Sequence, residues 1–77
     1  MPTVLEVNGF RFFFYSNDHE PKHIHVEKSD STAKYNIIII ELLKSKGFNA
    51  KELKQVREII EENQSFLINK WDEFFSN

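Results

Sequence analysis

The sequence predicts an α+β domain, with a four-stranded, mainly antiparallel sheet in the first half and helices packed on one face of it. Short runs of β-branched and aromatic residues, separated by turn dipeptides, fill residues 3–40. From residue 53 onwards, apolar residues recur at helical spacing instead. A run of strands followed by helices is typical of α+β architecture.

The chain begins with a predicted β-hairpin. Thr3 to Val7 and Phe10 to Ser16 are β-rich runs on either side of Asn8-Gly9. This dipeptide is preferred in two-residue type I′ turns because both residues tolerate positive φ. The segment from Asn17 to Pro21 is expected to be a loop, since Asn and Asp favour turns and Pro21 has no amide hydrogen to donate.

Two further strands are expected to complete a meander. His23 to Lys28 alternates polar and apolar side chains, as a half-buried strand does. Residues 29–32, Ser-Asp-Ser-Thr, form a predicted turn. Lys34 to Ile40 then forms the fourth strand, whose four consecutive isoleucines predict burial on both faces.

The second half of the chain predicts helix. Residues 41–48 remain unassigned, because Leu42-Leu43 fits both a longer strand and a helical turn ending at Gly47. Asn49 followed by Glu52 has the form of a capping box, which predicts a helix over residues 50–62. The helical period continues as one bent helix or a second short one, with four residues expected in the core: Leu67, Trp71, Phe74 and Phe75.

Length and composition limit the classes of protein to consider. Seventy-seven residues predict one domain, 1–77, and so small a domain hides only about 60 to 65% of its unfolded surface. A shallow surface site or a protein partner is therefore expected rather than a deep pocket. The absence of cysteine excludes disulfides and thiolate metal sites. No signal-peptide pattern or long apolar run is present, so we expect a cytoplasmic protein without membrane contact.

The net charge of −2 argues against a generally basic nucleic-acid binder, although a local basic patch remains compatible with it. The strand half contains Arg11, Lys22, Lys28 and Lys34. Six of the twelve acidic residues lie in the helical half: Glu52, Glu58, Glu61, Glu62, Asp72 and Glu73.

The three histidines are the side chains of this sequence that are best suited to a catalytic or binding site. If Ile24 and Val26 face the helices, alternation places His23, His25 and Glu27 on the opposite face. The same argument for Phe10, Phe12 and Phe14 places three further side chains on that face: Arg11, Phe13 and Tyr15. His19 is expected at the rim, on the loop between the two strands.

This set of side chains suits metal-independent RNA cleavage. Histidine can both accept and donate a proton near neutral pH, so His23 and His25 are the predicted acid and base. Arg11 is the predicted phosphate clamp. Tyr15 or His19 is the predicted positioning group, and Tyr15 or Phe13 is expected to stack on an unpaired base.

Two alternatives stay open at this point. His19, His23 and His25 suit a divalent metal site for zinc or nickel, with Glu27 as a further ligand. Alternatively, histidines close to Asp18, Glu20 and Glu27 simply make hydrogen bonds that fix the loop, and the sheet face is a docking surface.

Several segments together resemble the small bacterial proteins of domain-of-unknown-function family 4160, over nearly the whole chain. They are residues 1–5 (MPTVL), 9–16 (GFRFFFYS), 17–21 (NDHEP), 23–26 (HIHV) and 46–48 (KGF), with Glu62-Asn63 and Trp71 towards the end. The histidine segment is the most specific part. The chain departs from the family pattern at Lys22, where a second proline is expected, and in its isoleucine run.

The resemblance implies a prokaryotic protein that is often encoded beside another small domain, in an arrangement like a toxin–antitoxin pair. It carries no established activity. We therefore expect one half of such a module, possessing ribonuclease activity if it is the toxin. Its expected partners are a cognate small protein encoded nearby and RNA, and a homo- or hetero-oligomer is compatible with the sequence. The competing class is a non-enzymatic binding domain that uses the sheet face or an edge strand.

Overall fold

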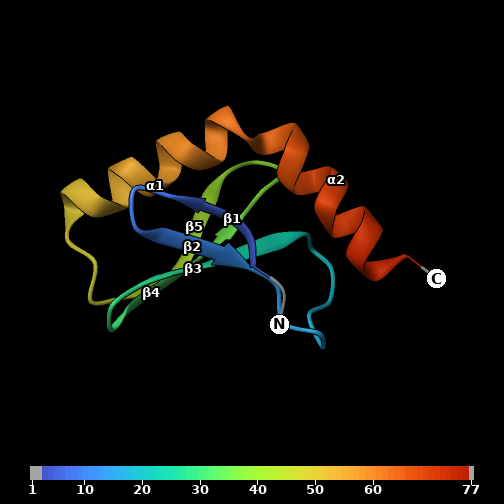
Figure 1. Cartoon of the computed structure of the whole chain (residues 1–77), viewed down its shortest axis with the longest axis horizontal. Helices are drawn as coiled ribbons and strands as arrows, with labels where there is room; N and C mark the ends of the chain where they lie inside the picture. The colour runs from blue at the N-terminus through green and yellow to red at the C-terminus, as the bar shows by residue number, and fades with distance from the viewer. Residues whose placement is uncertain (1–2, 77) are drawn as a thin grey trace.

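The computed structural model describes residues 3–76, which form a five-stranded antiparallel sheet followed by two helices. The sheet order is the chain order, and both helices arch over one face of the sheet (Figure 1). The elements are β1 (Thr3–Val7), β2 (Phe10–Phe13), β3 (His23–Lys28), β4 (Ser31–Asn36), β5 (Glu41–Lys46), α1 (Ala50–Glu62) and α2 (Gln64–Phe75). The α+β class and the antiparallel sheet are confirmed, whereas the predicted number of four strands is wrong.

The first hairpin has the predicted turn. Asn8 and Gly9 both have positive φ, 53° and 85°, as the two-residue turn between β1 and β2 requires. The second strand is shorter than predicted and ends at Phe13 rather than Ser16. Beyond it, the Tyr15 amide donates a hydrogen bond to the Asp18 side chain instead of to a neighbouring strand. The chain therefore leaves the sheet earlier than its β-rich composition suggests.

The isoleucine run is a turn, and the prediction of a strand buried on both faces is wrong. The strand β4 begins and ends earlier than predicted, and residues 37–40 connect it to β5. The Asn36 side chain accepts hydrogen bonds from the amides of Ile38 and Ile39, which turns the chain away from the sheet. Ile37 and Ile40 are buried, whereas Ile38 and Ile39 are exposed.

The carbonyl groups of this turn are held by side chains from the helices. Gln64 donates to the carbonyl oxygens of Ile37 and Ile38, and Arg57 donates to that of Ile40. These hydrogen bonds satisfy backbone groups that a strand would have paired with a neighbour. The unassigned segment that follows is the edge strand β5, which is exposed along its whole length.

The first helix has the predicted boundaries, Ala50 to Glu62. Asn49 and Glu52 form the predicted capping box at the start of α1. The helix ends at Glu62, and Asn63 separates it from α2, so the second half contains two short helices rather than one bent one. Neither helix has the length and apolar character needed to cross a membrane, and the described part of the chain, residues 3–76, contains no other helix.

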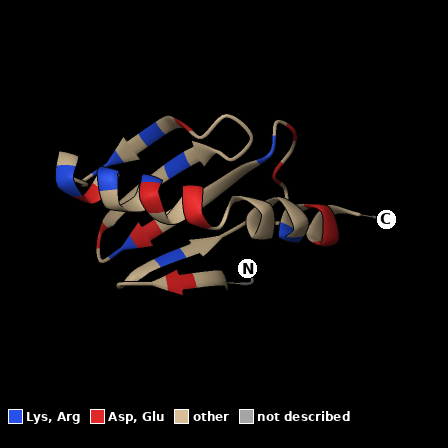
Figure 2. Cartoon of the chain, turned by 90° about the horizontal axis from the view of Figure 1, so that it is seen from above, with Lys and Arg blue, Asp and Glu red and all other residues tan. Residues whose placement is uncertain are grey.

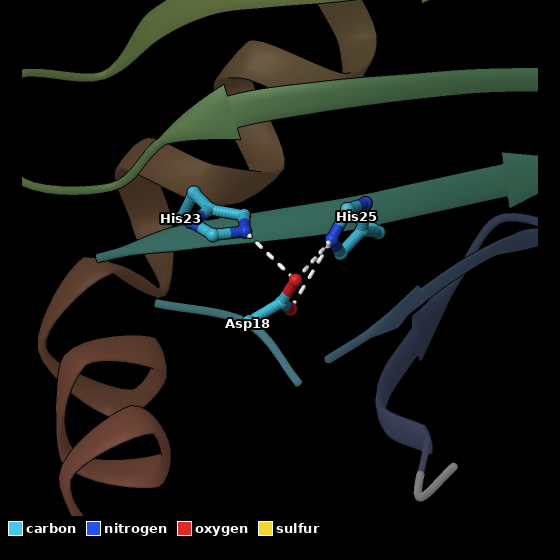
Figure 3. Close-up of side chains that lie close together, drawn as sticks. All are labelled: Asp18, His23 and His25. Atoms are coloured by element: carbon cyan, nitrogen blue, oxygen red, sulfur yellow. Dashed lines mark hydrogen bonds and ion pairs between the residues drawn. The ribbon is translucent and has the colours of Figure 1, made fainter. Parts of the chain in front are cut away.

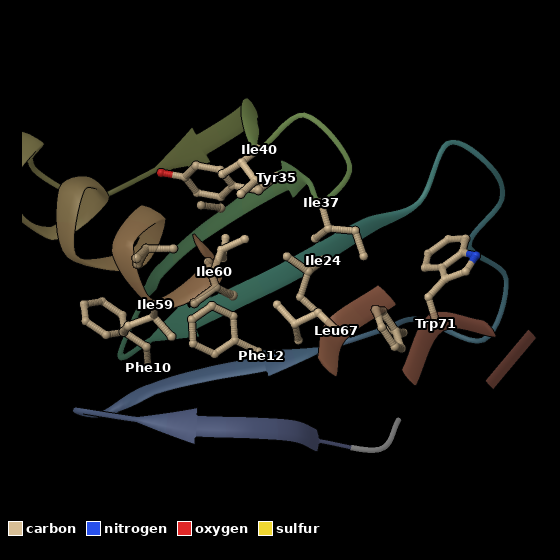
Figure 4. Packing of buried hydrophobic residues seen from close by; sticks show 14 residues of the cluster. Phe10, Phe12, Ile24, Tyr35, Ile37, Ile40, Ile59, Ile60, Leu67 and Trp71 are labelled. Carbon is tan, nitrogen blue, oxygen red and sulfur yellow. The ribbon is translucent and has the colours of Figure 1, made fainter. Parts of the chain in front are cut away.

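The core lies between the sheet and the helices (Figure 4). Phe10, Phe12 and Phe14 are buried as alternation predicts, and so are Ile24 and Val26 of β3. The strand β4 contributes Tyr35, whose hydroxyl donates to the Leu53 carbonyl oxygen of α1. The remaining large members come from the turn and the helices: Ile37, Ile40, Val56, Ile59, Ile60, Leu67 and Trp71.

Of the aromatic residues predicted to enter the core from α2, Trp71 is buried, Phe75 is half-buried and Phe74 is exposed. Trp71 closes the end of the core that lies beside the segment between β2 and β3 (Figure 4). Its ring lies 5.4 Å from that of Phe14 and 5.2 Å from that of His23, measured between centroids. It therefore links α2 to the sheet.

We predict that Trp71→Ala lowers the free energy of unfolding by about 3 to 5 kcal/mol, because it removes a large side chain from a packed site. Urea denaturation followed by circular dichroism measures this change. Phe66→Ala is the matched control, since the Phe66 ring lies on the same helix and is 40% exposed. Equal losses in the two variants would contradict the assigned role of Trp71.

Candidate functional site

The face of the sheet that the helices leave open brings together several side chains predicted for the site. In the register of β2 and β3, Arg11 lies opposite Glu27 and Phe13 lies opposite His25. The rings of Phe13 and His25 stack with centroids 5.6 Å apart. Tyr15 lies against both, with its ring centroid 4.5 Å from that of His25. Because these neighbours cover it, Phe13 is buried although it faces away from the helices.

Arg11 is engaged with neighbours on the same face. Its guanidinium forms an ion pair with Glu27 and donates a 2.8 Å hydrogen bond to the Thr3 hydroxyl. The guanidinium carbon also lies 4.3 Å from the centroid of the Phe13 ring. Arg11 thus holds β1, β2 and β3 together, which makes it a poorer phosphate clamp than the sequence predicted.

Asp18 joins the two histidines of β3 (Figure 3). His25 Nε2 lies 3.2 Å from both carboxylate oxygens, and His23 Nε2 lies 3.2 Å from Oδ1. The Tyr15 amide donates to Oδ2 at 2.9 Å, and the Asp18 amide donates to the Tyr15 carbonyl oxygen at 3.1 Å. The loop after β2 therefore folds back so that the half-buried carboxylate of Asp18 faces both imidazoles.

His23 lies deeper in the protein than His25. It is only 8% exposed, and its ring packs against Trp71 of α2. Its Nδ1 lies 2.8 Å from the Pro21 carbonyl oxygen, which can only accept a hydrogen bond, so Nδ1 carries the proton. The predicted alternation therefore holds for Ile24 and Val26, but only His25 of the two histidines borders the open face.

The local environment changes the protonation of the cluster. Burial by itself raises the pKa of Asp18, but the hydrogen bond from the Tyr15 amide and the adjacent rings of His25 and His23 outweigh it, and the pKa lies below its ordinary value. Burial lowers the pKa of His25 below its ordinary value of 6.5, and the neighbouring Asp18 offsets only part of this effect. At neutral pH, Asp18 is therefore a carboxylate and His25 is uncharged.

A shallow groove of about 300 Å³ begins at His25 and crosses the open face towards β5. Phe13, Tyr15 and His25 line its aromatic end. The other end is basic, because β4 and β5 contribute three lysines to the lining: Lys34, Lys44 and Lys46. Among the described residues, none of these lysines forms an ion pair.

The basic groove is compatible with the net negative charge because the charges are segregated. Six of the twelve acidic residues lie on α1 and the end of α2, whereas β5 carries two of the three groove lysines (Figure 2). A second hollow, of about 480 Å³, lies between β1 and α2, and its lining residues Lys70 and Glu73 pair with each other. The groove on the open face is therefore the stronger candidate for an anionic ligand.

Two predicted contributors lie elsewhere. His19 is exposed, and the group of potential metal ligands in the described chain consists of Asp18, His23 and His25 without it. Lys22, one of the basic residues of the strand half, pairs with Asp72 of α2 at 2.8 Å.

Sequence reasoning named Asp18 only as a hydrogen-bond partner of the histidines, a contact that the structure confirms, and did not select Lys44 or Lys46. The spacing of Lys44 and Lys46, two residues apart, would have placed both on one face if residues 41–46 had been assigned to a strand. Asp18 had no such pattern, because its contact with the histidines depends on how the loop folds back.

The fold and the site define a small α+β protein with a basic groove on its open sheet face and an aspartate–histidine cluster at one end. The family described as domain of unknown function, DUF4160, matches residues 9–72. The chain therefore belongs to this family, as its resemblance suggested. No curated protein matches the chain, and no solved structure does.

We predict that the imidazole of His25 titrates below 6.5 in metal-free protein, because burial disfavours its charged form. Asp18→Asn should lower the midpoint further, since it removes the carboxylate that favours the imidazolium. Nuclear magnetic resonance of the imidazole carbons across pH 4–8 measures both values. A midpoint above 6.5, or a rise in Asp18→Asn, would contradict the assignment.

The lowered pKa of His25 also determines the direction in which the stability of the protein changes with pH. The folded-state pKa of His25 is below that of the unfolded chain, so the unfolded chain binds more protons as the pH falls below about 6.5. The contribution of His25 to stability is thus complete above this pH and declines below it. His25→Gln should remove this part of the decline in denaturant unfolding.

Proposed function

We propose that this protein is the RNA-binding and RNA-cleaving component, the toxin, of a toxin–antitoxin-like pair, and that single-stranded RNA lies in the groove on the open sheet face. The lining of the groove is the observation that supports the proposal most strongly. Three lysines lie along it beside the exposed Tyr15 ring and the His25 imidazole. Proteins that bind single strands combine a basic groove with aromatic side chains on which bases stack.

Each part of the groove has a distinct role in this proposal. Lys34, Lys44 and Lys46 contact successive phosphates, in place of the engaged Arg11. Tyr15, which is 40% exposed, stacks on an unpaired base. Phe13 lies beneath Tyr15 and His25 and holds both rings in position.

The chemistry of cleavage is centred on the His25 end of the groove. Metal-independent cleavage requires one group that takes the 2′-OH proton and another that gives a proton to the leaving oxygen. His25 borders the groove and is the base, whereas His23 is covered by Trp71 and positions His25 through their shared contact with Asp18. Lys34, which lies opposite His25 on β4 and also lines the groove, gives the proton to the leaving oxygen.

We predict that the double variant Lys44→Glu, Lys46→Glu binds a fluorescent single-stranded RNA at least about tenfold more weakly at 50 mM salt, because phosphate contacts dominate such affinity. The slope of log affinity against log salt concentration should become shallower by about 1.4, or about 0.7 per lost contact. Fluorescence anisotropy measures both quantities. RNA cleavage and growth inhibition should fall in parallel.

The double variant Lys51→Glu, Lys54→Glu is the matched control. It makes the same change in net charge at exposed positions of α1, on the helical side of the protein. Equal weakening of RNA binding in the two double variants would show a non-specific charge effect and contradict the groove as the binding site.

An exposed apolar patch favours a second function, binding of the cognate small protein. It comprises Ile38 and Ile39 of the turn before β5, and Leu42 and Leu43 of β5 itself. The strand β5 is also an edge of the sheet, so its outer backbone groups can pair with an extended segment of another chain. An extended segment with apolar side chains is the partner that this edge suits.

Co-expression with the product of the adjacent gene tests this second function. We expect the partner to co-purify with the wild-type chain and to be lost from Leu42→Lys, Leu43→Lys, because the charges disrupt an apolar contact. Phe66→Lys places the same charge on an exposed ring of α2 and should retain the partner. Retention in both variants would exclude β5 as the docking edge.

A further inference from the structure

We propose that Asp18, His23 and His25 form a binding site for one divalent transition-metal ion, with zinc as the best-suited ion. The nearest ring nitrogen of each histidine and a carboxylate oxygen of Asp18 all lie within 4.8 Å of one another. The site differs from the metal alternative in the sequence analysis because Asp18 takes the place of His19. It stands on the geometry of these three side chains and does not depend on RNA as the substrate.

The hydrogen bond between His23 and Pro21 favours a metal ion between these side chains. Its Nδ1–H donates to the Pro21 carbonyl oxygen, so the neutral ring presents a bare lone pair at Nε2. That lone pair points at an oxygen of the Asp18 carboxylate only 3.2 Å away. Two acceptors at this distance repel each other, whereas a metal ion between them would be attracted to both.

The second argument is that the surroundings of His23 match those of a metal-binding histidine. Such histidines almost always donate their other ring N–H to a carbonyl or carboxylate group, which fixes the tautomer and directs the free nitrogen at the ion. Pro21 supplies that carbonyl group. Trp71 packs against the ring and keeps it in this orientation.

The third argument comes from distances. Zinc binds nitrogen and oxygen ligands at about 2.0 to 2.2 Å, so two ligands of a tetrahedral ion lie roughly 3.4 Å apart. Both histidine nitrogens lie 3.2 Å from the carboxylate oxygens of Asp18. Small side-chain rotations therefore suffice to admit the ion. The distance that must shorten is the one between the ligand nitrogens of the two histidines.

The ligand set indicates what the ion would do. Three protein ligands leave the fourth tetrahedral position for water or a substrate oxygen, as in catalytic rather than structural zinc sites. Because His25 belongs to both the cluster and the groove lining, the ion would lie at the end of the groove.

The test is zinc binding by chelator-stripped protein at pH 7.5 without RNA, measured by isothermal titration calorimetry and by metal analysis after dialysis. We expect one zinc per chain in the wild type. Asp18→Asn and His25→Gln should weaken binding by about 100-fold or more, since each removes a ligand. His19→Gln is the matched control, because it removes an exposed imidazole from the same loop and should leave binding unchanged.

Fluorescence of Trp71 gives a second readout that reports position. It is the single tryptophan of the chain, and its ring lies 5.2 Å from that of His23. Stoichiometric Co²⁺ should quench it in the wild type and in His19→Gln but not in Asp18→Asn or His25→Gln, and circular dichroism confirms that each variant is folded.

The absence of saturable zinc binding in the wild type would overturn the inference. Binding that depends on His19, or that survives both ligand variants, would overturn it equally. RNA binding measured in the presence of a chelator is a separate experiment, so failure of the metal site and failure of the proposed function are distinguishable.

Discussion

The carboxylate of Asp18 is the interaction on which the open face of this protein depends. It accepts hydrogen bonds from the Tyr15 amide and from His25, and its Oδ1 faces His23, so it ties the segment between β2 and β3 to the sheet. This contact brings Tyr15 against His25 and fixes how both imidazoles point. Burying a carboxylate is costly unless it is well paired, and here the partners are the histidines themselves. The aromatic end of the groove therefore depends on the contacts of the Asp18 carboxylate with the Tyr15 amide and the two histidines.

The two faces of the sheet differ in their side chains and in what covers them. Phe10, Phe12, Ile24 and Tyr35 pack against the helices, which carry six of the twelve acidic residues. The opposite face therefore presents lysines with few competing carboxylates, since Glu27 is already paired with Arg11. This segregation explains how a chain with a net charge of −2 can offer a cationic groove. Total charge is a poor guide to binding when the charges are separated by a sheet.

Local sequence patterns predicted those parts of the fold that local interactions determine. The Asn8-Gly9 turn, the Asn49 capping box and the burial of Ile24 and Val26 depend on residues close together in the chain. The isoleucine turn was missed because contacts distant in sequence hold it, namely those of Arg57 and Gln64 with its carbonyl groups. Alternation likewise identified His25 as a groove residue. It missed Asp18, because no periodicity relates a loop residue to the strand that it contacts.

The central claim is that the open sheet face, rather than the helices or the exposed edge, is the RNA-binding surface. Titration of the ¹⁵N-labelled protein with a short single-stranded RNA, followed by amide chemical shifts, tests it most directly. The account predicts that the largest shifts fall on residues that line the groove: Tyr15, His25, Lys34, Lys44 and Lys46. Shifts concentrated on α1 and α2, or on residues 38–43 alone, would contradict it. So would a complete absence of saturable shifts at low salt.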